Sequence, residues 1–111
     1  MTGNEDVREI VDRKLRDIWL QSREIIEGRL AILGEAVQML ERGELTAAKR
    51  AEAMTAAHKL TGSLGMFGHR KASSIAGEIE ARLEQDASVK DSDIPGLVKS
   101  LERALAGAFE E

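Results

Sequence analysis

The sequence lacks cysteine and tyrosine, contains a single proline, and has only three aromatic side chains among its 111 residues. Without cysteine, disulfide bonds and thiol chemistry are excluded. Three aromatic rings are few for stacking on bases, and a net charge of −4 offers no broad attraction to a phosphate backbone. We therefore expect neither a redox function nor a nucleic acid partner.

Long apolar runs are also missing. No uninterrupted stretch approaches the roughly 18 residues that span a bilayer, and the acidic start MTGNEDVREI lacks the features of a signal peptide. We expect a cytoplasmic protein without membrane attachment. The length suits one modest core, so we expect a single domain over residues 1–111, with a helical bundle over about 18–108 and an N-terminal helical extension over 1–17.

Apolar residues at the start of the chain recur at the spacing of one helix face. This pattern predicts one long helix over about residues 4–42, or two helices that abut near Gly28. Gly43 is expected to end it, and Trp19 is expected to anchor it on the core because a large indole is normally buried. The stripe comprises Val7, Val11, Ile18, Ile26, Leu30, Leu33, Val37 and Leu40.

The rest of the chain also shows helical periodicity and no strand-like alternation. Thr46 is expected to cap a helix over 47–66, and a further helix is expected over 70–85. The polar stretch DASVKDSD is the expected linker, and Asp93 at its end is expected to cap the last helix. Four or five helices joined by short turns predict an all-α, up-and-down four-helix bundle.

One of the two histidines, His58, lies in a run of small residues, AAHKLTGSLGMFGH. Leu60 and Leu64 fall on the opposite side of the predicted helix, so the imidazole should face water if the leucines enter the core. A glycine such as Gly62 costs a helix about 1 kcal/mol relative to alanine, which favours a site that something bulky approaches closely. The positions that share a face with His58 are Ala51, Met54, Thr55, Thr61, Gly62 and Gly65.

The segment AHKLTGSLGMFG, followed by ASSIAGEIE, resembles the phosphorylation segment of histidine phosphotransfer (HPt) domains. In that motif an exposed histidine is followed four residues later by glycine, with a second glycine at the end of the helix; His58, Gly62 and Gly68 occupy these positions. The segment is most similar to a subgroup that reads AHKLAGSLGTFG, and an upstream IW pair fits that subgroup. The commonest HPt form has lysine three residues after the histidine, where this chain has Thr61.

The resemblance implies a phosphocarrier that moves a phosphoryl group between His58 and the aspartate of a response-regulator receiver domain. A histidine kinase or hybrid kinase is the other implied partner. The receiver would supply Mg²⁺, so the chain itself would need no cofactor and no metal site. GSLGMFG lacks the strand and the GK[ST] of a phosphate loop, which predicts a carrier and not an enzyme. We expect it to be a monomer.

Several side chains near His58 are candidates for receiver docking or for contact with the phosphoryl group. The set comprises Lys59, Thr55, Thr61, Gly62, Gly65 and Met54. The threonine hydroxyls, and that of Ser63, alternatively bond to a carbonyl one turn earlier. Leu64 and Met66 are further apolar candidates, with burial in the core as the alternative. Lys59, Arg70 and Lys71 are the cations expected to replace the missing lysine.

Two other features have plain structural interpretations. His69 is expected to be a surface or helix-start residue, and Glu80 and Glu84 to belong to a solvated helix face. Two functional alternatives remain beside the phosphocarrier. One is an HPt-like module that binds a receiver or kinase as adaptor or inhibitor without phosphate turnover, and the other is a helical oligomerisation domain that uses the long first stripe.

Overall fold

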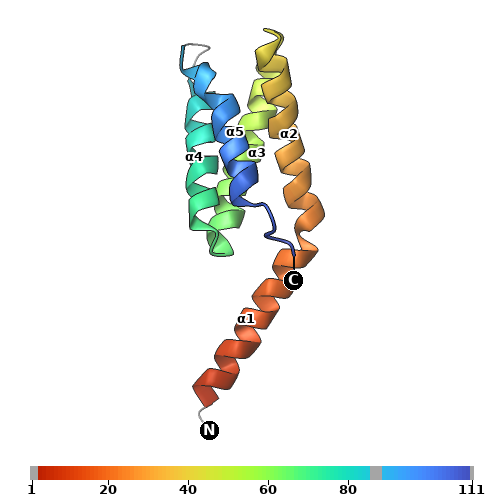
Figure 1. Ribbon diagram of the computed structural model, residues 1–111, viewed down its shortest axis with the longest axis vertical. Coiled ribbons are helices and arrows are strands. Elements are labelled where there is room, and N and C mark those ends of the chain that lie inside the picture. Colours follow the sequence, from red (N-terminus) through yellow and green to blue (C-terminus); the bar gives the residue numbers. More distant parts are fainter. Residues whose placement is uncertain (1–2, 86–88, 111) are drawn as a thin grey trace.

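The computed structural model describes residues 3–85 and 89–110, and this part of the chain contains helices and no strand. Helices α2 to α5 form an up-and-down bundle, and α1 projects from one end of it (Figure 1). This arrangement confirms the all-α bundle. None of these helices is long and apolar enough to cross a membrane. The elements are α1 (Gly3–Gln21), α2 (Arg23–Glu41), α3 (Ala47–Met66), α4 (Arg70–Glu84), the 3-10 helix η1 (Val89–Asp93) and α5 (Ile94–Ala104).

The first two helices meet at Ser22, so the junction predicted near Gly28 is wrong. The Ser22 hydroxyl donates a hydrogen bond to the carbonyl of Ile18 at 2.8 Å. A serine that bonds back to the preceding turn often bends a helix, and the chain changes direction here (Figure 1). Gly28 lies inside α2.

The bend divides the predicted apolar stripe into two parts. Ile26 and Leu33 of α2 are buried in the core, each with 1% of its surface exposed. On α1, by contrast, Val7, Val11 and Ile18 are 59%, 48% and 48% exposed. The expectation that one continuous stripe packs on the core is therefore wrong for α1.

The predicted start of α3 and the predicted end of α2 are confirmed. Thr46 accepts a hydrogen bond from the backbone N–H of Lys49 at 3.1 Å, as an N-cap does. Gly43 has a φ of 70°, and Glu44 N–H donates to the Met39 carbonyl at 2.8 Å. This Schellman geometry satisfies carbonyls that the end of the helix leaves open.

Asp93 stands at the N-cap position of the last helix, as predicted, but the expected capping bond does not form. The Asp93 side chain makes no capping hydrogen bond; it lies 3.4 Å from Nε of Arg82 in an ion pair. The 3-10 helix η1 also occupies most of the stretch interpreted as a linker. The remaining linker residues, 86–88, lie outside the described part of the chain.

The core formed by α3, α4 and α5 confirms the helical periodicity predicted for the rest of the chain. Helix α3 packs most extensively on α4, and many of the side chains between them are alanines that let the two backbones approach closely. The Ser73 hydroxyl donates to the Thr61 carbonyl at 2.7 Å across this interface. The buried residues of the three helices are Ala53, Ala56, Ala57, Leu60, Leu64, Ala72, Ala76, Ile79, Leu83, Ile94, Val98 and Leu101.

Trp19 anchors α1 on the bundle, as predicted. Its side chain is 4% exposed, and its indole N–H donates to the Ala108 carbonyl at 2.8 Å. The indole stacks on Phe109 with ring centroids 4.4 Å apart, and it also contacts Phe67 and His69. Three segments that are distant in sequence therefore meet around one side chain.

At the opposite end of the bundle, Arg50 of α3 holds the end of α4. Its guanidinium binds both carboxylate oxygens of Asp91, at 2.9 and 3.0 Å. It also donates to the carbonyls of Leu83 at 2.9 Å and Gln85 at 2.6 Å. Because the last carbonyls of a helix lack partners within it, this one side chain closes α4 and fixes η1 beside it.

We predict that Arg50→Ala lowers the free energy of unfolding by about 3 kcal/mol, because it leaves a mostly buried carboxylate without its partner. Arg50→Lys should recover only part of the loss, since an ammonium cannot bind both oxygens and the carbonyls in one plane. Denaturant unfolding measures both effects. The control is Arg42→Ala, which removes only the exposed pair with Glu44 and should change stability by less than about 0.5 kcal/mol. Equal losses from Arg42→Ala and Arg50→Ala would contradict the assignment.

Candidate functional site

His58 lies in the middle of α3 on its solvent side. Its side chain is 73% exposed, whereas Leu60 and Leu64 are fully buried. The prediction that the leucines face the core and the imidazole faces water is confirmed. Burial of Leu64 also removes it from the apolar docking candidates.

Glu80 of α4 holds one side of the His58 ring. Its Oε2 lies 2.8 Å from Nδ1 of His58, and the Glu80 side chain is only 22% exposed. The interpretation of Glu80 as part of a solvated face is therefore wrong. A carboxylate accepts hydrogen bonds and donates none when ionised, so Nδ1 carries the proton that joins the two groups. In the neutral ring, this leaves the lone pair on Nε2.

The α3–α4 hairpin explains why these two residues meet. His58 and Glu80 stand eleven residues before and after His69, at the turn between the helices. The same relation holds for Thr61 and Gly77, eight residues from the turn, whose closest atoms would be 3.8 Å apart if Gly77 carried a Cβ. Antiparallel helices joined by a short turn pair residues in this mirrored way. This regularity is the sequence signal that could have identified Glu80 and that the sequence analysis missed.

Thr61 does not turn its hydroxyl toward His58. The hydroxyl donates to the carbonyl of Ala57 at 2.9 Å, and the side chain is half-buried. The Ser63 hydroxyl accepts a hydrogen bond from Arg29 of α2 at 3.3 Å. Both hydroxyls therefore have partners within the bundle.

Two residues near His58, one turn before it and one residue after it, border a shallow groove between α2 and α3. Thr55 and Lys59 are exposed and line this groove together with Ile32 of α2. Within the described residues, the Lys59 ammonium forms no ion pair. Lys59 is thus a free cation one residue from His58.

The other candidates lie farther from the imidazole or are partly covered. Met54 is half-buried and lines a depression against the end of α4, whereas Met66 is 66% exposed. Arg70 and Lys71 stand at the start of α4, about 15 Å along the helix from Glu80 at 1.5 Å per residue. Their charges therefore lie at a different level of the bundle from His58.

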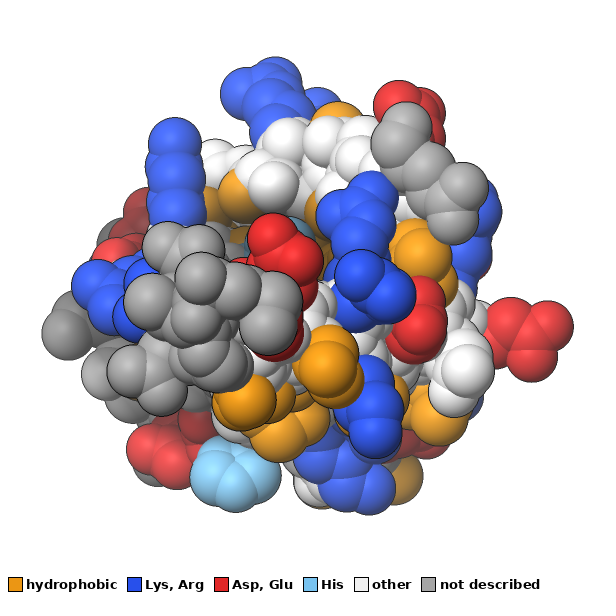
Figure 2. Space-filling view, turned by 90° about the horizontal axis from the view of Figure 1, so that it is seen from below, with side chains coloured by type: hydrophobic (Ala, Val, Ile, Leu, Met, Phe, Trp, Pro, Cys, Tyr) orange, Lys and Arg blue, Asp and Glu red, His pale blue; other side chains and the backbone are white. Residues whose placement is uncertain are grey.

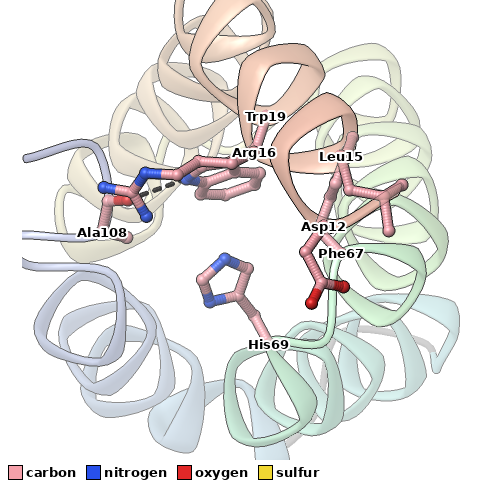
Figure 3. A pocket seen from close by; sticks show the side chains of 7 residues that line it. All are labelled: Asp12, Leu15, Arg16, Trp19, Phe67, His69 and Ala108. Carbon is pink, nitrogen blue, oxygen red and sulfur yellow. Dashed lines mark hydrogen bonds between the residues drawn. The ribbon is translucent and has the colours of Figure 1, made fainter. Parts of the chain in front are cut away.

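His69 stands at the start of α4, as predicted, but it is half-buried and not a free surface residue. Its ring centroid lies 4.3 Å from that of Trp19. Figure 3 shows it facing a small pocket at the junction of α1 with the bundle, opposite Arg16 and Asp12. The His69 ring packs on Trp19 beyond the end of α3, whereas His58 binds Glu80 in the middle of that helix, so the two imidazoles do not form one site.

The two glycines near His58 have different surroundings. A Cβ on Gly62 would meet no atom within 4 Å, so the surface beside the imidazole is open. A Cβ on Gly65 would lie 3.3 Å from Oγ of Ser73, which is held by its bond to the Thr61 carbonyl. Gly65 therefore serves the close packing of α3 on α4.

We predict that Gly62→Ala raises the free energy of unfolding by up to about 1 kcal/mol, since alanine favours a helix and nothing opposes the added methyl group. Gly65→Ala should raise the free energy of unfolding by a smaller amount or lower it, because Ser73 must move. Thermal melts of the two variants measure the difference. The opposite order of stability would contradict the distinction between an open glycine and a packing glycine.

Comparison with known proteins identifies the family of this chain. A family model described as "Hpt domain" matches residues 17–109. The chain is 32% identical over 91 residues to Protein RcaC of Microchaete diplosiphon, an alignment that covers 82% of this chain and 14% of that protein. The chain thus spans about one seventh of its relative's length. No solved structure matches. The chain belongs to the Hpt domain family, whose members serve as phosphocarriers in phosphorelays and are not kinases.

Proposed function

We propose that His58 is the phosphoryl acceptor and donor of this carrier, and that it exchanges the group with an aspartyl phosphate on a receiver domain. The observation that supports this most directly is the state of the ring: Nδ1 is bound to Glu80 and the imidazole is 73% exposed. Nε2 is then the nitrogen with a free lone pair. The open surface at Gly62 leaves room for a bulky partner.

The transfer balances without a proton acceptor in solution. The Nε2 lone pair attacks phosphorus, the N–P bond forms, and the P–O bond to the aspartyl carboxylate breaks with its electrons remaining on that carboxylate. The imidazole ring gains positive charge while Nδ1 keeps its proton. The Glu80 carboxylate, 2.8 Å from Nδ1, faces that developing charge and stabilises it.

The rest of the charge compensation is assigned to the partner. Phosphoryl transfer depends mainly on alignment and on neutralisation of the phosphoryl oxygens. On this proposal the receiver brings Mg²⁺ and its acidic pocket, and Lys59 contributes a cation from this chain. A histidine kinase or hybrid kinase is the source of phosphoryl groups further upstream.

A competing function is a module that docks a receiver without accepting phosphate. The observation that favours it is Thr61, which replaces the usual lysine and whose hydroxyl bonds to the helix backbone. Such a module would form a complex with a phosphorylated receiver and gain no phosphate.

The decisive experiment incubates the protein with Mg²⁺ and receivers charged by acetyl phosphate, and reads its intact mass. We expect one acid-labile phosphate on the wild type and none on His58→Gln, with the melting temperature nearly unchanged because the side chain is exposed. Phosphate on the His58→Gln variant would show that another residue is the acceptor. A stable complex without phosphate on the wild type would select the docking module.

Glu80 gives a second test. Glu80→Ala should release the ring, so that both neutral tautomers are populated and transfer slows by about tenfold or more. Nitrogen NMR of the imidazole measures the tautomers, and the rate comes from the same mass assay. Glu80→Gln, which keeps an acceptor oxygen but removes the charge, should keep the Nδ1–H tautomer and lose part of the rate. Glu84→Ala, one turn away, is the control. Equal rates for the wild type and Glu80→Ala would contradict a positioning role.

A further inference from the structure

Three pairs of positions face each other along the α3–α4 hairpin, at four, eight and eleven residues on either side of the turn at His69. On each helix the three positions share one face, because residues three, four or seven apart lie on the same side of a helix. In order from the turn, the pairs are Gly65 with Ser73, Thr61 with Gly77, and His58 with Glu80. The pair nearest the turn therefore lies about 10 Å along the helices from the pair that contains the imidazole.

The first two pairs each combine a glycine with a side chain of the opposite helix. A Cβ on Gly65 would lie 3.3 Å from Oγ of Ser73, which is shorter than an ordinary van der Waals contact. A Cβ on Gly77 would lie 3.8 Å from the Thr61 side chain, which is an ordinary contact distance. Of these two pairs, Gly65 and Ser73 thus leave the less room between the helices.

A hydrogen bond fixes the helices beside this close pair. The Ser73 hydroxyl donates to the Thr61 carbonyl at 2.7 Å, and the serine is half-buried. A serine inside a helix often bonds back to a carbonyl of its own helix, whereas this one reaches across to α3. Within the described residues, this bond and the His58–Glu80 contact are the side-chain hydrogen bonds that join the two helices, apart from those of Arg50 at the far end of α4.

The contact between His58 and Glu80 needs support of this kind. The imidazole is 73% exposed, and contacts between partly exposed charged and polar side chains are individually weak because ordering the side chains costs entropy. Charged side chains of both signs are intermixed on the surface, as Figure 2 shows for one end of the molecule. Charge alone therefore does not select Glu80 as the partner of the ring, and the separation of the two helix backbones must do so.

From these contacts we infer that Ser73 is a positioning residue for His58. By binding the Thr61 carbonyl, it holds α4 at the separation and register at which Oε2 of Glu80 meets Nδ1 of the ring at 2.8 Å. Nδ1 then keeps its proton and Nε2 its lone pair. Ser73 stands about two helical turns from Glu80 and acts on the ring through the helices. Its effect on transfer rests on the function proposed for His58, whereas its effect on the ring proton does not.

The inference also gives a structural role to Thr61, which stands where the commonest form of the family has lysine. Its hydroxyl bonds to the Ala57 carbonyl, and its side chain faces Gly77 at the distance of an ordinary contact. A lysine would keep the backbone carbonyl that Ser73 binds but would not keep this compact side chain opposite the glycine. Thr61 therefore serves the fit of α3 against α4.

Nitrogen NMR of the imidazole, at a pH where the ring is neutral, tests the inference without any partner. We expect Ser73→Ala to lower the population of the Nδ1–H tautomer toward that of Glu80→Ala. Phosphate uptake from a charged receiver should slow by about threefold or more, because the lone pair is then less often on Nε2. The control is Ser74→Ala, which removes the hydroxyl of the next residue; Ser74 is exposed, and its side chain forms no hydrogen bond within the described part of the chain.

Two further comparisons separate positioning from general loosening. Thr46→Ala removes the N-cap of α3 and destabilises the fold without touching α4, so the tautomer should not change. Gly65→Ala should shift the tautomer because its methyl group crowds the Ser73 hydroxyl, whereas Gly77→Ala adds the same group where there is room and should not. An unchanged tautomer in Ser73→Ala, or an equal shift in Thr46→Ala, would overturn the inference. The expected tautomer shift together with no phosphate uptake by the wild type would support the positioning role and count against the proposed function alone.

Discussion

The close approach of α3 and α4 is the constraint on which the site depends. Gly65 and Ser73, four residues on either side of His69, come so near that a single methyl group on the glycine would crowd the serine hydroxyl. The same mirrored pairing continues up the hairpin to His58 and Glu80, whose ring nitrogen and carboxylate oxygen are 2.8 Å apart. The alanines and glycines of this interface therefore do more than fill space, because they determine the distance at which the carboxylate holds the imidazole.

Much of this could be predicted from the sequence, because it depends on local periodicity. The bounds of α3, its cap at Thr46 and the solvent-facing position of His58 all follow from the spacing of apolar residues and from turn chemistry. Prediction of the Glu80 contact requires one further step, which is to pair residues that stand at equal distances before and after the turn at His69. The Arg50–Asp91 pair could not be found in this way, since it depends on how η1 folds after α4 and no short-range pattern encodes that.

Helix α1 shows where periodicity stops being informative. A stripe at helical spacing predicts that a face is apolar, and it does not say which molecule covers that face. The bend that separates α1 from the bundle occurs at Ser22, a residue that helices tolerate, while the more suspect Gly28 continues α2 without a break. Val7 and Val11 therefore looked like core residues in the sequence and are exposed in the fold.

The positions of the stabilising contacts explain how a carrier can expose its reactive group at little cost. Arg50 closes one end of the bundle and Trp19 the other, whereas the exposed His58 side chain in the middle of α3 is held by its bond to Glu80. If His58 carries phosphate, Glu80 stabilises the charge on the ring, while the Thr61 hydroxyl stays bound to the backbone and offers the phosphoryl oxygens nothing. The chain would then bind the phosphoryl group weakly, and the partner's cations would decide the direction of transfer. That balance suits a carrier, because a group held too firmly could not be passed on.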